Sequence, residues 1–190
     1  MAPLGRPPAR PPEQPGQARQ GAVLLLLYPK AANWYIVFGK RPSHLRHHPG
    51  QVAFPGGRCE AGESYETAAL RETHEELGVP PATIHLLGPL TPIYIPPSDF
   101  EVHPYVGWTA AQPLFLPAPD EVEEVVEMPL AHLADSRNRI VGEWQYPFFR
   151  FGEHRIWGGT AVILNEFRER LAQSEELTPS ELLPPPNLAK

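Results

Sequence analysis

The chain has 190 residues, of which 42% are hydrophobic, and a net charge of −6 at pH 7. This length suits one domain with tails, and the hydrophobic content is enough to bury a substantial core. The negative charge argues against binding along a nucleic-acid backbone, which normally needs a basic face, and favours a free small-molecule substrate. The single cysteine, Cys59, cannot form an internal disulfide, so a reducing compartment is expected.

The N-terminal stretch Met1–Gln20 is rich in proline, carries three arginines and has almost no large apolar residue, so we expect a disordered tail. Its proline density disfavours the amphipathic helix of a transit peptide, and it has no apolar signal core. A cytoplasmic protein is therefore expected.

The apolar run Ala22–Tyr28 predicts a buried central strand, because it is far shorter than the ~20 residues that cross a bilayer. Trp34–Lys40 follows a short polar turn and is expected to pair with that strand.

The next segment, Gly39–Gln51, is strongly basic and rich in histidine. A solvated basic loop is one interpretation, and a histidine metal site is another. The segment lacks the G-x-x-x-x-G-K-[ST] order of a P-loop. Because it leads directly into the motif that follows, its cations are placed to meet phosphates held there. The side chains concerned are Lys40, Arg41, His44, Arg46, His47 and His48.

A strand, a glycine turn, a loop and a helix follow. The pattern predicts a strand at Gln51–Phe54, a turn at Pro55-Gly56-Gly57 and a helix from about Ser64 to Leu77. Two adjacent glycines let the backbone turn tightly and approach a ligand closely. They also free the carbonyl of Gly56 to face a metal ion.

Three glutamates gather on one face of this predicted helix. At about 100° per residue, Glu72, Glu75 and Glu76 fall within roughly 100° of one another, and Ala68 shares their face. Their Cβ atoms are expected about 5–6 Å apart, close enough for the carboxylates to repel, so a cation should lie among them. Oxygen ligands of this kind suit Mg²⁺ or Mn²⁺. The positions that point the other way, toward a core, are Leu70, Thr73 and Leu77.

A solvated acidic helix face is the simpler explanation for three glutamates. The glycine turn before the helix favours the metal site instead. Glu63 and Arg71 add a pair of opposite charges that is placed to brace the loop against the helix and to fix the metal ligands from behind.

The stretch from Gly57 to Val79 resembles the signature box of the Nudix hydrolases. It has Gly57, five residues, Glu63, seven residues, and then Arg71-Glu72-Thr73-His74-Glu75-Glu76-Leu77-Gly78-Val79; Thr73 stands where the family usually has a larger aliphatic residue. The resemblance implies the Nudix α/β/α sandwich with a mixed sheet, and metal-dependent hydrolysis of a diphosphate. It implies catalytic roles for Glu63, Arg71, Glu72, Glu75 and Glu76, with Glu72 the first choice as general base. It also implies metal contacts from Glu72, Glu75, Glu76 and the Gly56 carbonyl.

The basic segment extends the resemblance. Its motif is similar to the one upstream of the box in the coenzyme A pyrophosphatase branch, which cleaves coenzyme A to 3′-phosphoadenosine 5′-phosphate and 4′-phosphopantetheine. The resemblance implies substrate contacts by Arg41, Arg46, His48 and Gln51, with the two arginines on the phosphates. The matching positions are Arg41, Ser43, Leu45, Arg46, His48, Gly50, Gln51, Val52 and Phe54-Pro55-Gly56-Gly57.

Two other functions stay open at this point. The first is hydrolysis of another nucleoside diphosphate derivative, such as ADP-ribose, NADH or a nucleoside triphosphate, because the box recognises the diphosphate and not its substituents. The second is a non-catalytic nucleotide-binding module, against which the intact box glutamates argue.

Downstream of Pro80-Pro81, which ends the helix, Thr83–Leu90 predicts a strand. Thr91–Trp108 predicts two strands around a rigid loop at Pro96-Pro97 and again resembles the coenzyme A branch. In that branch the loop helps to wall the site. Phe100 is therefore a candidate substrate contact, stacking on adenine or lining the pantetheine channel, although aromatics at strand spacing are more often core. Tyr94 and His103 are further candidates for the same contact.

Asp120–Met128 predicts a strand with an acidic side. Some Nudix enzymes draw a further carboxylate from outside the box, which makes Glu121 or Glu124 a candidate, although edge strands are commonly charged for solubility. The remaining predicted elements are a short helix at Pro129–Ala134, a hairpin of Arg139–Gln145 with Phe148–Phe151, and an amphipathic helix from Ile156 to about Leu171.

The expected organisation is a tail at residues 1–20, one Nudix domain at 21–173 and a loose tail at 174–190. The expected partner is a small nucleotide, coenzyme A, rather than nucleic acid or a membrane. The resemblance is compatible with a homodimer, but the sequence pattern identifies no exposed surface that would form the dimer interface.

Overall fold

The computed structural model of the chain describes residues 18–45, 48–141 and 147–173. Its central element is strand β1 (Arg19–Lys30), in which every residue from Leu24 to Tyr28 is at most 1% exposed. Strand β2 (Asn33–Lys40) pairs antiparallel with it across a short turn, which confirms the two strands expected from the first apolar runs.

Strand β1 starts earlier than the sequence pattern indicated. It begins at Arg19, inside the stretch assigned to the tail, because strand β7 (Phe100–Thr109) runs parallel to it and reaches far enough to pair Phe100 with Arg19. The Arg19 N–H also donates to the carbonyl of Asp99 at 2.9 Å. The rest of the two expected tails, residues 1–17 and 174–190, lies outside the described residues.

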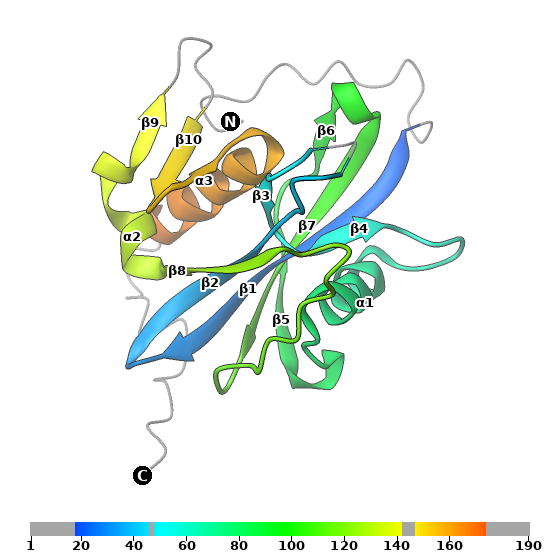
Figure 1. Cartoon of the computed structure of the whole chain (residues 1–190), viewed down its shortest axis with the longest axis horizontal. Helices are drawn as coiled ribbons and strands as arrows, with labels where there is room; N and C mark the ends of the chain where they lie inside the picture. The colour runs from blue at the N-terminus through cyan, green and yellow to red at the C-terminus, as the bar shows by residue number, and fades with distance from the viewer. Residues whose placement is uncertain (1–17, 46–47, 142–146, 174–190) are drawn as a thin grey trace.

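The large sheet is mixed, as expected (Figure 1). Its main path runs β3–β2–β1–β7–β5, and every pair of strands in it is antiparallel except β1 with β7. Three more strands attach at the sides: β4 pairs with β1, β6 with β7, and β8 with β2. The bounds are β3 (Val52–Ala53), β4 (Gly56–Arg58), β5 (Ile84–Pro89), β6 (Ile93–Ile95) and β8 (Glu124–Pro129).

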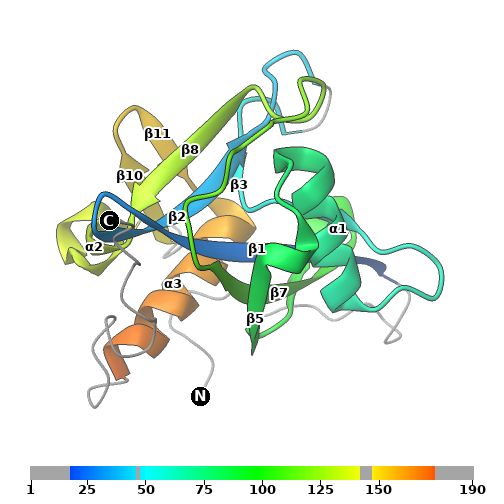
Figure 2. The same ribbon diagram turned by 90° about the horizontal axis from the view of Figure 1, so that it is seen from below.

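One helix covers each face of this sheet, so the architecture is the α/β/α sandwich (Figure 2). Helix α1 (Tyr65–Leu77) packs on the face that carries Leu24 and Leu26, and helix α3 (Gly158–Gln173) packs on the face that carries Leu25 and Leu27. The alternation of side chains along a strand therefore divides the fully apolar run of β1 between two cores.

A small second sheet lies beside α3. It is antiparallel, in the order β11 (His154–Ile156), β10 (Pro147–Phe151) and β9 (Arg139–Val141). Pairing of β9 with β10 confirms the late hairpin for its described part, while residues 142–146 lie outside the described residues. Strand β11 was not anticipated, because three residues are too few to show a hydrophobic period.

The short helix α2 (Leu130–Ala134) and the long α3 match expectation, and single 3₁₀ turns occupy Pro81–Thr83, Pro96–Ser98 and Ser136–Asn138. Residues 120–123 form a turn instead of the start of a strand, so β8 is shorter than predicted. In the part of the chain that the structure describes, no helix has the length and apolar character needed to span a membrane.

Candidate active site

Helix α1 spans the predicted residues, but Gly78 ends it before Pro80-Pro81, to which the sequence pattern assigned its end. The Ser64 hydroxyl accepts the N–H of Thr67 at 3.1 Å, which caps the N-terminus. Gly78 takes a left-handed conformation, with φ 72°, and donates its N–H to the carbonyl of His74, which closes the C-terminus. Thr73 is fully buried, and its hydroxyl donates to the carbonyl of Ala69 at 2.7 Å, so its polar atom is satisfied within the helix.

The glutamate face of α1 is itself partly buried, which the helical wheel did not show. Ala68, expected to share an open face with the carboxylates, is completely buried, and Glu76 is only 7% exposed. The reason is that β4 crosses this face of the helix: the Gly56 N–H donates to Glu76 Oε2 at 3.1 Å. The face is thus a covered site instead of a solvated surface.

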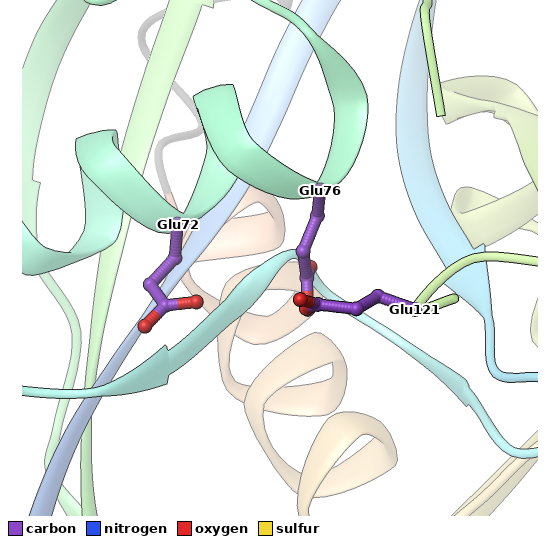
Figure 3. A group of neighbouring side chains, drawn as sticks. All are labelled: Glu72, Glu76 and Glu121. Atoms are coloured by element: carbon purple, nitrogen blue, oxygen red, sulfur yellow. The ribbon is translucent and has the colours of Figure 1, made fainter. Parts of the chain in front are cut away.

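Three carboxylates converge at this point (Figure 3). Glu72 and Glu76 project from α1, and Glu121 reaches toward them from the turn before β8; one oxygen of each lies within 4.8 Å of the others. The segment leading to that turn runs against the end of α1, because the N–H groups of Leu116 and Ala118 donate to the carbonyls of Leu77 and Glu76 at 2.9 Å. Of the two acidic candidates outside the box, the structure brings Glu121 into the cluster.

Glu124 occupies a different environment. Its carboxylate pairs with Lys40 Nζ at 3.1 Å and with His154 Nε2 at 3.2 Å. It therefore links β2 and β11 to β8 and does not share the space between α1 and the turn.

Glu75, the third glutamate of the helical motif, also points elsewhere. Its carboxylate accepts Arg71 Nη1 at 2.8 Å, and its side chain is 51% exposed. The helical wheel predicts Glu75 beside Glu72 and Glu76. In the structure, Glu121 is the third carboxylate of that group. The metal and catalytic roles of Glu75 stay predictions.

Arg71 braces the loop from behind, as its spacing from Glu63 predicts. Its guanidinium donates to both oxygens of Glu63 at 2.9 and 3.1 Å, to Glu72 at 3.0 Å, and to the carbonyl of Arg58 at 3.0 Å. These contacts raise the pKa of Arg71 and lower that of Glu63, so both groups are charged. One cation therefore fixes the loop after β4 and orients Glu72.

Burial controls the protonation of the cluster. Desolvation raises the pKa of Glu76 to about 8, the charges of Glu121 and Glu72 add to the shift, and the Gly56 N–H and the charge of Arg41 oppose it. The pKa of Glu72 is raised for the same first reason, and its bond to Arg71 works against the shift. Two neighbouring carboxyls whose pKa values are raised by burial mark a candidate functional site.

The two glycines that were predicted to form a turn lie instead in strand β4, because they pair with Val23 and Ala22 of β1, and they leave room for these side chains. A Cβ added to Gly57 would lie 2.6 Å from the carboxylate atoms of Glu72, and one added to Gly56 would lie 2.3 Å from the carbonyl oxygen of Ala22. Gly56 also has φ 151°, a conformation that side chains disfavour. Glycine is thus required at Gly56, where a Cβ would meet the backbone of β1, whereas at Gly57 it leaves free the space that the Glu72 carboxylate occupies.

The donor set fits a divalent cation. Carboxylate oxygens are the ligands that Mg²⁺ and Mn²⁺ prefer. Glu72, Glu76 and Glu121 offer three such oxygens within one small space, and a cation there would stabilise the ionised carboxylates, which burial disfavours. The Gly56 carbonyl stays a predicted fourth donor.

The basic segment begins at the edge of this cluster. The Arg41 N–H donates to the Gln51 carbonyl at 2.9 Å, and the Gly50 N–H donates to the Arg41 carbonyl at 3.2 Å, so the segment closes on itself. Arg41 Nε is buried and has no hydrogen-bond partner among the described residues, which leaves a donor suited to an anion. His48 is exposed with φ 54°, and Arg46 lies outside the described residues.

The aromatic candidates separate onto two faces. Phe100 lies against Gly21 and under the guanidinium of Arg19, whose Cζ is 4.6 Å from the ring centre. His103 stacks instead on Tyr65 of α1, with ring centres 3.5 Å apart, and burial lowers its pKa. Tyr94 donates its hydroxyl to Asp99 at 2.9 Å. Arg19 beside Phe100 is a cation that the sequence pattern did not single out, since it was counted with the tail.

Comparison with known proteins places this geometry in a family. A family model described as the NUDIX domain matches residues 18–150. The uncharacterized Nudix hydrolase NudL of Pectobacterium atrosepticum is 36% identical over 166 residues, which cover 79% of this chain and 81% of that protein. The human protein named mitochondrial coenzyme A diphosphatase NUDT8 is 40% identical over 139 residues, covering 67% of this chain and 59% of the human protein.

Solved structures support the same fold. The Nudix hydrolase RenU from M. smegmatis superposes with a TM-score of 0.60 at 20% identity, covering 83% of this chain and 88% of that one. A MutT/nudix family protein from Enterococcus faecalis superposes with a TM-score of 0.59 at 19% identity, covering 89% of this chain and 68% of the other. At these identities the structures establish the fold alone. Together with the family model and the relatives, the sandwich and the glutamate helix show that this chain belongs to the Nudix hydrolases, which act on diphosphate bonds.

Proposed function

We propose that this Nudix hydrolase cleaves the diphosphate of coenzyme A, yielding 3′-phosphoadenosine 5′-phosphate and 4′-phosphopantetheine. The observation that carries the reaction type is the convergence of Glu72, Glu76 and Glu121, together with the buried Nε of Arg41, which has no hydrogen-bond partner within the described part of the chain. The substrate rests on the upstream motif at Arg41–Gly57 and on the human relative whose name specifies coenzyme A diphosphatase activity.

Charge determines the roles of the residues. Glu72, Glu76 and Glu121 would hold Mg²⁺ or Mn²⁺, with the Gly56 carbonyl as a further donor. When bound, such a cation neutralises the diphosphate charge and lowers the pKa of a water molecule. Arg71 holds Glu72 in place through its 3.0 Å bond, so Glu72 is positioned to accept the proton of the attacking water as general base.

The residues around the cluster are proposed to bind and orient the substrate. Arg41 is placed to bind a phosphate oxygen, a charge-assisted contact worth roughly 1.5–3 kcal/mol. Arg46, His48 and Gln51 are proposed to complete the phosphate-binding segment, and Phe100 to contact the adenine or the pantetheine arm.

The test is product analysis by mass spectrometry. The purified chain is incubated with coenzyme A and Mg²⁺ or Mn²⁺, and in parallel with a chelator. We expect 3′-phosphoadenosine 5′-phosphate and 4′-phosphopantetheine with metal and intact coenzyme A with chelator. Intact coenzyme A under all conditions, together with cleavage of ADP-ribose, NADH or a nucleoside triphosphate, would overturn the substrate assignment within the family.

A further inference from the structure

Two segments far apart in the sequence supply the parts of the site that α1 does not. The first is the basic segment that begins at Arg41, directly after β2. The second is the turn at residues 118–123, which carries Glu121. Both must face the same pair of helix carboxylates, and both are irregular in structure.

The β-ladder between β2 and β8 stops just short of both segments. Its last pair joins Lys40 to Glu124, and the Glu123 N–H then donates to the Lys40 carbonyl at 2.8 Å. Buried Val122 packs on Gly39, where an added Cβ would lie 3.2 Å from Val122 Cγ2. The ladder pairs no residue of the basic segment with a residue of the turn, so ladder hydrogen bonds do not fix their relative positions.

The side chain of Glu123 bridges them. Its Oε2 accepts both the backbone N–H of Ser43, at 2.9 Å, and the hydroxyl of Ser43, at 3.1 Å. Lys40 Nζ lies 4.0 Å from the other oxygen. A single carboxylate oxygen on the turn thus holds the second residue after Arg41 by two hydrogen bonds.

The bridge connects to the catalytic cluster at each end. On one side, Glu121 precedes Glu123 in a turn closed by the N–H groups of Glu121 and Val122 on the Ala118 carbonyl, at 3.0 and 2.8 Å. On the other side, Arg41 lies close enough to Glu76 for its charge to favour the ionised carboxylate. Displacing the bridge would therefore move a carboxylate and a cation of the site together.

We propose that Glu123 is a positioning residue that holds the basic segment and the turn in register through Ser43, so that Arg41 and Glu121 face the same carboxylates. It does not itself touch the cluster. This inference rests on the proposed metal-dependent hydrolysis, but not on which diphosphate is the substrate.

Three variants of the full chain test it. Glu123→Ala removes both hydrogen bonds, Ser43→Ala removes only the hydroxyl bond, and Glu123→Gln keeps an amide oxygen that can accept both. Glu169→Ala is the matched control, because its carboxylate also accepts a side-chain hydrogen bond, from Asn165 at 2.8 Å, but on the far helix α3. The readouts are Mn²⁺ binding to the substrate-free protein by electron paramagnetic resonance, and kcat and KM for the best diphosphate substrate.

Glu123→Ala is expected to weaken Mn²⁺ binding and to raise KM, each by about 3- to 30-fold, as for loss of a charge-assisted hydrogen bond. Glu123→Gln should stay within about threefold of the wild type, and Ser43→Ala should fall between the two. In the Ser43→Ala/Glu123→Ala double variant the effects should not add, because the second change removes a bond already lost.

The proposal is overturned if Glu123→Ala binds Mn²⁺ and substrate like the Glu169→Ala control, if only its melting temperature falls, or if the Ser43 and Glu123 effects add. Failure of the wild type to cleave coenzyme A overturns the proposed substrate instead. Mn²⁺ binding still decides the role of Glu123 in that case, so the two failures are distinguishable.

Discussion

Glu121 faces Glu76 across the site, with their carboxylate oxygens within 4.8 Å, although one residue lies in a turn before β8 and the other in α1. Backbone hydrogen bonds bring the two residues together, because they tie the segment at Leu116 and Ala118 to the end of the helix. The cluster thus contains carboxylates from two separate segments, α1 and the turn before β8.

Replacing Glu76 by glutamine should remove most of the turnover while preserving the fold. The side chain contacts β4 and the cluster, not the apolar core, and loss of a metal-binding or proton-transferring carboxylate costs about 100-fold or more in kcat. Steady-state kinetics and circular dichroism measure the two effects. Glu66→Gln, on the exposed first turn of the same helix, is the control. Near-normal turnover with unchanged metal dependence would contradict this role.

Stability without metal should fall as pH rises. The Glu76 pKa in the folded protein, about 8, lies above its ordinary value of 4.5, so the folded state retains a proton that the unfolded chain releases. Its contribution is therefore fully present below about pH 4.5 and is lost by about pH 8. Thermal melts in chelator across this range should show a falling melting temperature, and Glu76→Gln should have a shallower slope. An unchanged slope in the variant would refute the assignment.

Added metal should act in the opposite sense. Mg²⁺ or Mn²⁺ binds the ionised carboxylates, so it should raise the melting temperature and release protons on binding at pH 7. Calorimetric titration in two buffers of different ionisation enthalpy measures the protons released. Binding without proton release would show that Glu76 is already ionised in the metal-free protein.

Glu121→Gln should weaken Mn²⁺ binding more than Glu75→Gln does. Glu121 shares the cluster with Glu72 and Glu76, whereas Glu75 is engaged by Arg71 and is half exposed. Parallel Mn²⁺ titrations of the two variants make the comparison. The reverse order would assign the third carboxylate to Glu75, as the helical wheel predicts.

Gly57→Ala should reduce kcat by about tenfold or more with little loss of stability. The new Cβ would lie 2.6 Å from the Glu72 carboxylate, and this flexible side-chain end can move aside at little cost to the fold but leaves its place beside Glu76. The same change made in a Glu72→Gln background should cause little further loss of kcat. A similar further loss in that background would mean that the methyl group acts elsewhere.

The sequence by itself determined the local parts of this protein. Apolar runs predicted β1 and β2, the pattern predicted a box helix from about Ser64 to Leu77, and the spacing of Glu63 and Arg71 predicted the ion pair that the structure contains. These features depend on residues that are close in the sequence, within one strand or a few helical turns. The two-residue alternation of a strand and the 3.6-residue period of a helix predict how such residues are arranged.

Only the tertiary structure decided which groups meet across the site. The helical period places Glu75 near Glu72 and Glu76, but it contains no information on β4, whose Gly56 N–H bonds Glu76, or on the turn that delivers Glu121. Arg71 bonds Glu75 at a position where the Arg58 carbonyl of β4 and Glu63 of the following loop bind the same guanidinium. Such contacts depend on where distant segments pack, and that is set by the whole sheet instead of by any local pattern.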